Sequence, residues 1–495
     1  MTSHPAPALS PPARGAHTSK PRVPARIARS ASAVASALVA IALLLACTSS
    51  PARPDLILIV VDTLRADRIA GPGDAPQPTP ELRALADGGL SFANATAPSS
   101  WTRPSVASLF TSRWPSEHGA VTLARPLAPS LPTLAELLRD AGYRTVGVSA
   151  NFVHVSEASG LARGFTSWQS PSEVADDPER ESVLHMDGVA GAAAERRALR
   201  ADEVNRRVLA ALPGRSVAPL FLYVHYMDPH SPYGDSDRPG GGPAHDVVSN
   251  DEVLALARRG GALPERERHR LVERYDADVR SADRAIGALL AALRERGWLE
   301  RSGVVVTSDH GEAFGEHGNW FHGTDLHAES LRVPLVLVGP GVAAGRRSDA
   351  AVDLLDVPTT LLRMAGVAPP AAMRGRDLRA LDGVGPRVRV AELHPDAALE
   401  ARVRARLERM ALSQGPWKSI WPRAGGPPLL FRTDRDPGER QPLAAEAAPA
   451  RVTHDFEATR RKVEEAASAM FEGAGPQPRL DEEERRGLRA LGYAE

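Results

Sequence analysis

The chain has 495 residues, enough to bury a large core and to form more than one domain. Hydrophobic residues make up 43% of the chain and charged residues 24%, a composition typical of globular proteins. Lys and Arg number 60 against 61 for Asp and Glu, so the charge balance gives no reason to expect nucleic acid as a partner.

The N-terminal 46 residues have the composition of an export signal. Residues 1–31 carry five basic and no acidic side chains, and a mostly apolar stretch then runs from Ala31 to Ala46 and ends in LLAC. A basic segment followed by a short apolar one is typical of a signal peptide, and the stretch is shorter than the roughly 20 residues of a membrane-spanning helix.

The LLAC ending resembles a bacterial lipobox. We therefore expect cleavage before Cys47, lipidation of its thiol and a cell-envelope location with the globular part outside the cytoplasm, held to the membrane by the lipid alone. An uncleaved anchor and plain secretion are the alternatives. Cys47 is the only cysteine, so the sequence excludes an internal disulfide, a thiol nucleophile and a cysteine-based metal site in the rest of the chain.

From residue 55 onward, predicted strands alternate with predicted helices. Short runs rich in β-branched residues predict buried strands, and amphipathic spacing predicts helices. Strands are expected at 55–62, 144–151, 219–230, 302–312 and 331–341, and helices at 79–89, 131–143 and 268–298. This alternation predicts an α/β fold with a doubly wound, mixed or mostly parallel sheet flanked by helices.

Near residue 385 the pattern changes to short segments, which predict a small antiparallel sheet, and a helix is expected over 452–471. Two polar stretches, 151–200 and 234–265, are expected to form loops that determine specificity. The predicted organisation is therefore a signal peptide (1–46), a lipidated linker (47–54), a catalytic α/β domain (55–384), a small β subdomain (385–445) and a helical, charged tail (446–495).

Polar side chains gather at the ends of three predicted strands: Asp62; His225, Asp228 and His230; Asp309 and His310. In an open α/β sheet, sites form outside the carboxyl ends of the strands, so these side chains are expected to meet at one edge. Taken singly, each aspartate could cap a helix and each histidine could be structural. The stretch SDHGEAFGEHGNWFHG (308–323) adds three histidines among four glycines, which is costly to order without a ligand.

Seven motifs, in order from about residue 55 to residue 443, resemble the sulfatase family of the alkaline phosphatase superfamily, and in particular arylsulfatases. They are LILIVVDTLRAD, SSWTRPSVASLFTS, DPHSPY, SDHGEAFGEHG, LRVPLVLVGPG, DLLDVPTTLLRMAGV and FRTDRDPGE. The resemblance implies a metal-dependent hydrolase of sulfate or phosphate esters.

The chain departs from the family at the nucleophile. Sulfatases oxidise a Cys or Ser to formylglycine at the position that Thr102 occupies here, and the Arg of that motif is replaced by Val106. In related branches of the superfamily an unmodified Thr attacks phosphorus, and a metal can activate such a hydroxyl. The resemblance therefore implies that Thr102 is a metal-activated nucleophile. The alternative is a helix cap in a member that has lost catalysis.

The resemblance also implies a set of metal ligands: Asp62, Thr102, Asp309 and His310. The second Asp of the family's first strand is Thr63 here. Sulfatases commonly bind calcium, whereas a ligand set with one imidazole and few oxygens favours Zn²⁺ or Mn²⁺. A second metal is a further possibility, because histidines stand where sulfatases place lysines.

The remaining site residues take substrate roles by the same resemblance. His230 and His322 are expected to be catalytic, and His225 and Asn151 to bind the substrate. The expected substrate is an ester of a small molecule, polysaccharide or lipid. Two alternatives stay open: a phosphoryl-transfer enzyme similar to phosphoethanolamine transferases or phosphodiesterases, and an inactive envelope protein that only binds.

Overall fold

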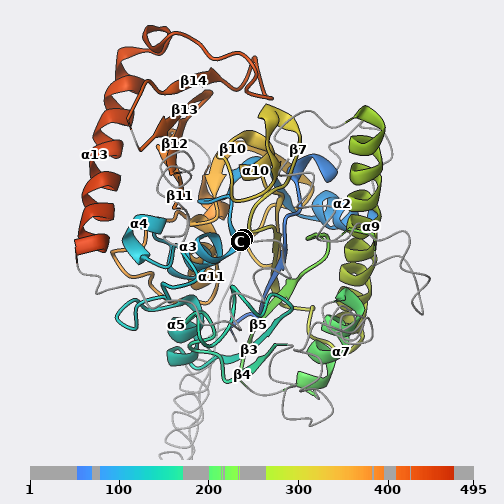
Figure 1. Cartoon of the computed structure of the whole chain (residues 1–495). Coiled ribbons are helices and arrows are strands. Elements are labelled where there is room, and N and C mark those ends of the chain that lie inside the picture. The colour runs from blue at the N-terminus through green and yellow to red at the C-terminus, as the bar shows by residue number, and fades with distance from the viewer. Residues whose placement is uncertain are drawn as a thin grey trace, which may run out of the picture. The chain divides into compact units, whose positions relative to one another are not determined.

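The computed structural model describes residues 53–69, 79–170, 200–212, 214–215, 218–231, 233–234, 264–381, 384–394, 408–423 and 425–472. Its centre is a sheet with helices on both sides (Figure 1). The sheet has eight strands in the order β10-β2-β9-β6-β1-β5-β3-β4. These strands are β1 (Leu56–Val61), β2 (Leu90–Thr96), β3 (Arg144–Ser149), β4 (Ser167–Gln169), β5 (Leu220–Tyr226), β6 (Gly303–Thr307), β9 (Leu335–Val338) and β10 (Arg346–Asp353).

The α-helices of the described residues are α2 (Pro80–Gly88), α3 (Thr102–Thr111), α4 (Pro115–His118), α5 (Leu134–Asp140), α7 (Ala201–Ala211), α9 (Glu265–Glu295), α10 (Ala328–Leu331), α11 (Asp356–Met364) and α13 (Ala450–Glu472). Short 3₁₀ turns are η1 (Ala66–Arg68), η4 (Glu316–Gly318), η5 (Leu378–Ala380) and η6 (Ala445–Ala447). The strands β7 (Ala313–Phe314) and β8 (Trp320–Phe321) form a two-stranded ribbon.

The predicted mixed, mostly parallel sheet is confirmed. The central strand β1 runs parallel to β5 and β6, and β3 runs parallel to β5. The strand β9 runs antiparallel to both β6 and β2. Because β1, β5 and β6 point the same way, their carboxyl ends meet at one edge of the sheet.

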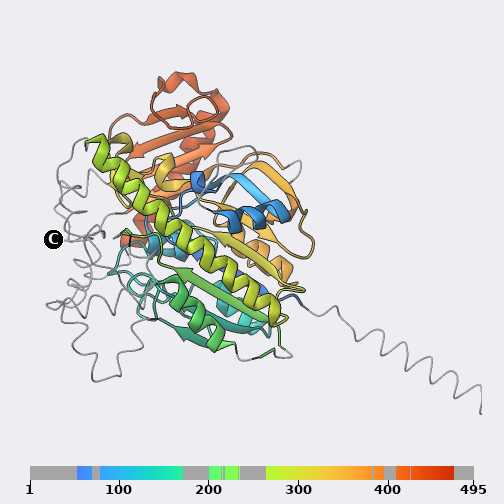
Figure 2. The same ribbon diagram turned by 90° about the vertical axis from the view of Figure 1, so that its right-hand side faces the viewer.

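The sheet is buried on both faces, and alternate residues of β1 enter different cores. Leu56, Leu58 and Val60 pack in a core with residues of α3, α5 and α11. Ile57 and Ile59 pack on the other face with residues of α2, α7 and α9. Figure 2 shows the long helix α9 crossing that second face.

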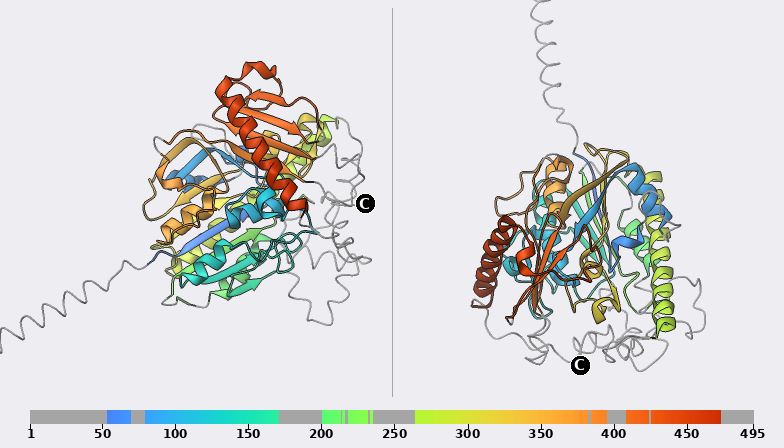
Figure 3. Two further views of the ribbon diagram at one scale, coloured as in Figure 1. Left: turned by 90° about the vertical axis from the view of Figure 1, so that its left-hand side faces the viewer. Right: turned by 90° about the horizontal axis from the view of Figure 1, so that it is seen from above.

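A second sheet is antiparallel, as predicted, with β11 (Arg389–Leu393), β12 (Arg409–Gln414), β13 (Trp417–Pro422) and β14 (Leu429–Arg432) in sequential order. The helix predicted over 452–471 is α13, which lies against this sheet (Figure 3). Phe456 and Val463 of α13 are buried in a core with Met410 and Leu412 of β12.

Some predicted segments lie outside the described residues: the export signal with Cys47, most of the two specificity loops (171–199 and 235–263), and the end of the tail beyond residue 472. Within the described part of the chain, every helix is too short or too polar to span a bilayer.

Candidate active site

Thr102 is the first residue of α3 and is fully buried. Its hydroxyl oxygen lies 3.2 Å from Nε2 of His310, and neither it nor the N-cap residue Trp101 caps the helix through a side-chain hydrogen bond. Ser105 joins this helix to the neighbouring strand end, because its hydroxyl donates to the carbonyl of Asp309 at 2.6 Å. The helix start therefore presents the Thr102 hydroxyl to the carboxyl end of β6 rather than to its own backbone.

Asp309 follows β6 with one carboxylate oxygen satisfied and the other not. Oδ1 accepts hydrogen bonds from the backbone N–H groups of Thr63 (3.2 Å) and His310 (2.9 Å). Oδ2 is buried without a hydrogen-bond partner among the described residues. Thr63 has φ of 57°, which is unfavourable for a β-branched residue and turns its N–H toward Asp309.

Asp62, at the end of β1, likewise has one carboxylate oxygen with a hydrogen bond and one without. Its Oδ2 accepts a hydrogen bond from Nδ2 of Asn151 at 2.8 Å, whereas its Oδ1 is buried with no hydrogen-bond partner in the described structure. Asn151, which was predicted to bind the substrate, thus contacts the Asp62 carboxylate in this structure.

His225, near the end of β5, faces Asp62. Its Nε2 lies 3.3 Å from Oδ2 of Asp62, and its Nδ1 lies 2.9 Å from the hydroxyl of Tyr223. When Nδ1 donates to Tyr223, Nε2 of the neutral ring carries a lone pair directed at a carboxylate. In that tautomer a cation between the two atoms would satisfy both, whereas if Tyr223 donates to Nδ1, the proton lies on Nε2 and faces Asp62.

Two buried carboxylates and the imidazoles around them govern each other's protonation. Burial opposes the charge of Asp62, but His225 and the nearby His230 and His310 lower its pKa below the ordinary range. Burial and the charge of Asp62 raise the pKa of Asp309. Such a divergence is expected when two acidic groups share a buried site and only one is readily ionised.

His310 is held in the tautomer that a metal ligand requires. Its Nδ1 lies 2.9 Å from the carbonyl of Gly311 and so carries the proton, which leaves Nε2 with the lone pair. Nε2 lies 3.5 Å from Oδ2 of Asp309 and 3.9 Å from Oδ1 of Asp62, the two oxygens without hydrogen bonds.

These atoms fit a divalent cation. Ligand atoms of Asp62, His225 and Asp309 all lie within 4.8 Å of one another, and the hydroxyl of Thr102 and Nε2 of His310 border the same space. Buried carboxylate oxygens without partners are costly, and a cation would satisfy both. Carboxylate oxygens and imidazole nitrogens are both common ligands of divalent metal ions.

His322 and His230 lie beside this group. The ring centroid of His322 is 4.6 Å from that of His310 and 4.9 Å from that of His230. Nδ1 of His322 donates to Oε1 of Glu312 at 2.8 Å, and Tyr233 donates to the other oxygen of Glu312. Nδ1 of His230 donates to the carbonyl of Ser231 at 2.7 Å.

The two imidazoles differ in their readiness to carry a proton. Burial opposes the charge of His322, but the carboxylate of Glu312 raises the pKa of His322 above its ordinary value. Burial lowers the pKa of His230. This difference suits an acid and a neutral hydrogen-bonding group at one site.

The structure thus brings the predicted site residues together at one edge of the sheet: Asp62, Thr102, Asn151, His225, His230, Asp309, His310 and His322. Tyr223 and Glu312 were not predicted. Tyr223 shares a face of β5 with His225 at a spacing of two, and Glu312 lies two residues after His310 in SDHGE, so the sequence could have indicated both.

Two other polar residues of these motifs have partners of their own. Asp228 accepts a hydrogen bond from the backbone N–H of Ala201, and His317 pairs with Glu329.

The sequence profile of the sulfatase family matches residues 54–367, the stretch that supplies every residue of this site. The choline-sulfatase of Rhizobium meliloti (strain 1021) is 26% identical over 431 residues, which cover 79% of this chain and 82% of that protein. A multifunctional alkaline phosphatase superfamily protein, PehA of Trinickia caryophylli, is 26% identical over 398 residues, covering 66% and 76%.

A solved phosphonate monoester hydrolase from Silicibacter pomeroyi has a similar fold. The TM-score is 0.63 at 20% sequence identity, with 83% of this chain and 95% of that chain covered.

Proposed function

Because the chain belongs to the sulfatase family, a family of ester hydrolases, we propose that it is a divalent-cation-dependent hydrolase of sulfate or phosphate esters with the unmodified hydroxyl of Thr102 as nucleophile. The observation that carries this proposal is the position of that hydroxyl, fully buried, 3.2 Å from Nε2 of His310 and beside the two carboxylates.

Thr102 itself is the best-supported nucleophile of the chain. The only cysteine is Cys47, far from the site in sequence, so a cysteine-derived aldehyde has no precursor here. The hydroxyl of Ser105 is occupied by the carbonyl of Asp309. Thr102 does not cap α3, which removes the structural role that would compete with catalysis.

The bound cation would lower the pKa of the Thr102 hydroxyl and polarise the ester group. Asp62, Asp309, His225 and His310 would hold this cation, and Asn151 and Tyr223 contact two of these side chains and so would orient them. The Thr102 hydroxyl gives its proton to solvent, Oγ1 attacks sulfur or phosphorus, and the bond to the leaving oxygen breaks as His322 protonates that oxygen. Water then gives a proton back to His322 and attacks the Thr102 ester at sulfur or phosphorus; the bond to Oγ1 breaks, the sulfate, phosphate or phosphonate is released, and Oγ1 takes a proton from solvent.

A phosphorus ester is the better match for the charges of the site. The chain contains three lysines. Lys20 lies in the predicted signal, Lys418 pairs with Glu439, and Lys462 lies on α13. The sulfate-binding lysines of sulfatases therefore have no counterpart at the site. His230 and His322 occupy that region instead, and neutral or protonated imidazoles can bind the oxygens of a phosphoryl group.

The substrate class and the location remain part of the proposal. The relative named choline-sulfatase supports an ester of a small molecule as the substrate, and esters of polysaccharides or lipids are the alternatives. We place the enzyme in the bacterial cell envelope through lipidated Cys47. Transfer of the phosphoryl group to an acceptor alcohol instead of water is the second candidate, because a Thr nucleophile supports both.

The test is an ester panel on the purified protein with Zn²⁺ or Mn²⁺: aryl sulfate, phosphate monoester, phosphodiester and phosphonate monoester, with and without an acceptor alcohol. Thr102→Ala should lose more than about a thousandfold in kcat, and Thr102→Ser should retain measurable turnover. Thr111→Ala, in the same helix, is the matched control and should turn over normally. Activity unchanged in Thr102→Ala would disprove the assignment, and no turnover of any ester would favour a binding protein.

A further inference from the structure

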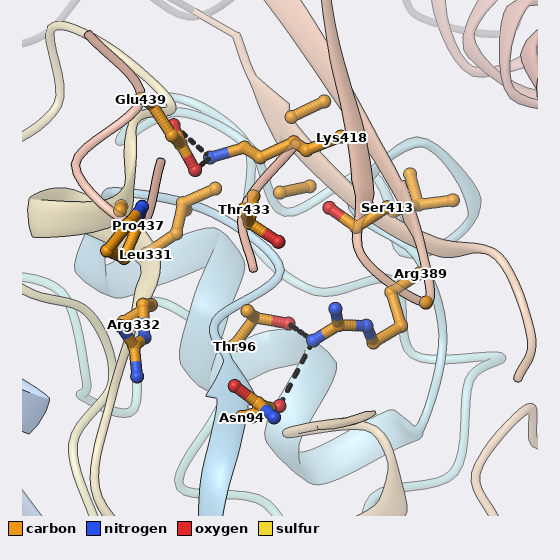
Figure 4. Close-up of a pocket in the computed structure, with 15 residues that line it drawn as sticks. Asn94, Thr96, Leu331, Arg332, Arg389, Ser413, Lys418, Thr433, Pro437 and Glu439 are labelled. Carbon is orange, nitrogen blue, oxygen red and sulfur yellow. Dashed lines mark hydrogen bonds and ion pairs between the residues drawn. The ribbon is translucent and has the colours of Figure 1, made fainter. Parts of the chain in front are cut away.

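A small cavity lies apart from the catalytic residues, where the end of β2 and α10 meet the second sheet. Its volume is about 80 Å³, roughly the space of two or three water molecules. Figure 4 shows Asn94 and Thr96 of β2 on one side, and on the other Ser413 and Lys418 of the second sheet with Thr433, which follows β14.

Arg389, the first residue of β11, extends into this space and is only 8% exposed. One terminal nitrogen, Nη1, donates to the carbonyl of Asn94 and to the hydroxyl of Thr96, each at 3.1 Å, and to the carbonyl of Val352 at 3.3 Å. Nε is buried without a hydrogen-bond partner in the described structure. The three acceptors are neutral, so they orient the guanidinium without balancing its charge.

The carboxylates near Arg389 are already engaged. Asp353 and Asp356 attract it, but both are ion-paired with Arg387, at 2.6 and 2.8 Å. Glu439, the carboxylate on the cavity wall, binds Lys418 through both oxygens at 2.8 Å and His327 at 3.2 Å. Among the described residues, no carboxylate forms an ion pair with Arg389.

A buried guanidinium without a counter-charge is costly. Burial lowers the pKa of Arg389 to about 10, which still leaves it protonated at neutral pH. The lining also includes Lys418 and Arg332 against the single carboxylate Glu439, so the walls are cationic. The hydroxyls of Ser413 and Thr433 lie across the cavity from Asn94 (Figure 4).

From this geometry we propose that the cavity is a binding site for a small oxyanion, a sulfate, phosphate or carboxylate group, with Arg389 as its principal ligand. The anion supplies the missing counter-charge and accepts hydrogen bonds from the guanidinium and the neighbouring hydroxyls. The site is separate from the catalytic cation site and does not depend on the ester chemistry proposed above.

The anion has two possible sources. A groove of about 570 Å³ adjoins the cavity and shares Ala328, Arg332 and Pro437 with it. Its other charged lining residues are Arg65, Arg347 and Arg440 and the carboxylates Asp67, Glu316 and Glu329. That volume is typical of a site for an organic ligand. The oxyanion is therefore either a free inorganic ion or the charged group of a larger molecule, such as a sulfated saccharide, lying in the groove.

The test is calorimetric titration of the full-length protein in an Asp62→Asn/Asp309→Asn background, which removes anion binding through the catalytic cation. Sodium sulfate, sodium phosphate and a sulfated disaccharide are titrated at constant ionic strength. We expect one equivalent of oxyanion per chain. Arg389→Met should weaken binding at least about tenfold, whereas Arg347→Met, on the groove, should leave inorganic sulfate binding within about twofold.

Ser413→Leu keeps Arg389 and fills the cavity, so it should also abolish binding, and it serves as the test if Arg389→Met fails to fold. If the disaccharide binds more tightly than sulfate and Arg440→Ala removes that difference, the ligand is a larger molecule that lies in the groove. If the disaccharide and sulfate bind with equal affinity, the ligand is the free ion. Absence of any oxyanion binding in the parent background, or binding unaffected by both Arg389→Met and Ser413→Leu, would overturn the proposal.

Discussion

The hydroxyl of Thr102 and Nε2 of His310 lie 3.2 Å apart in a fully buried setting. The carbonyl of Gly311 holds the His310 proton on Nδ1, so Nε2 can accept a hydrogen bond from the hydroxyl or share a cation with it. Thr102 and His310 can therefore remain close whether they share a hydrogen bond or a cation. Their contact also joins the start of α3 to the loop after β6.

His225 should determine how tightly the cation binds. His225→Asn removes a ligand, and Tyr223→Phe removes the hydroxyl that orients it. We expect affinity for Zn²⁺ to fall in Tyr223→Phe by about 10- to 100-fold, and further in His225→Asn. Competition with a chromophoric chelator measures this affinity. Tyr226→Phe, on the opposite face of β5 and bonded to Asn205, is the control, and an equal loss there would refute the assignment.

His322 should act on the leaving group rather than hold the first cation. The described residues gather one close group of carboxylate and imidazole ligands, so we expect one divalent cation per chain. His322→Ala should keep that content and lower kcat by about 10²- to 10⁴-fold. Two cations per chain, falling to one in His322→Ala, would instead support the second metal that the sequence suggested.

His317 should make stability depend on pH above neutrality. Its ring stacks on His327 with centroids 3.7 Å apart and donates to Glu329 at 2.8 Å and to the carbonyl of Glu439. The hydrogen bond to Glu329 raises the pKa of His317 to about 9. Because the pKa of His317 is higher in the folded than in the unfolded protein, its protonated ring stabilises the folded state. This stabilisation is complete at pH values below the unfolded-state pKa of about 6.5, and it is lost as the pH rises through 9.

His317→Gln should therefore lower the free energy of unfolding by about 1 kcal/mol at pH 6, after allowance for solvent screening, and should converge with the parent near pH 10. Denaturant titrations at several pH values measure the difference. His269→Gln, whose exposed ring faces Glu273 on α9, should show little effect at any pH. A pH-independent difference in His317→Gln would mean that packing rather than charge is responsible.

Lipidation of Cys47 is testable independently of the fold. Intact-mass analysis of detergent-extracted protein should find a chain that begins at Cys47 and carries a diacyl or triacyl group, because LLAC ends a short apolar segment. Cys47→Ser should release the protein from the membrane fraction or block its processing. A soluble product with a different N-terminus would exclude the lipoprotein assignment.

The sequence predicted the mixed, mostly parallel sheet and the small antiparallel sheet, and it placed the candidate site residues at the ends of strands. Asp62, Asp309 and His310 each follow an apolar run of β-branched residues, and parallel strands bring such ends together. The strand β2 was not predicted, because LSFANAT mixes buried and exposed residues without clear alternation. The antiparallel direction of β9 could not be predicted either, since apolar runs do not encode strand direction.

The sequence could not predict the directions in which the side chains of His225 and Asn151 point. Both were expected to contact substrate, and both turn toward Asp62. Spacing along the chain places a residue at the sheet edge, but the rotamer is set by partners such as Tyr223 that come from tertiary packing. The sequence could not predict that Arg389 lacks an ion-pair partner. This follows from the tertiary structure, in which Asp353 and Asp356 both form ion pairs with Arg387.

The most direct test of Thr102 as nucleophile is peptide mapping of the enzyme, loaded with Zn²⁺ or Mn²⁺ and acid-quenched during turnover of its best ester. We expect an unmodified Thr102 before reaction, and a single phosphoryl or sulfuryl group on Thr102 in the quenched sample. That adduct should be absent in Thr102→Ala and should accumulate when water attack is slowed. An active enzyme with no adduct on Thr102, or with the adduct on another residue, would show that Thr102 is not the nucleophile.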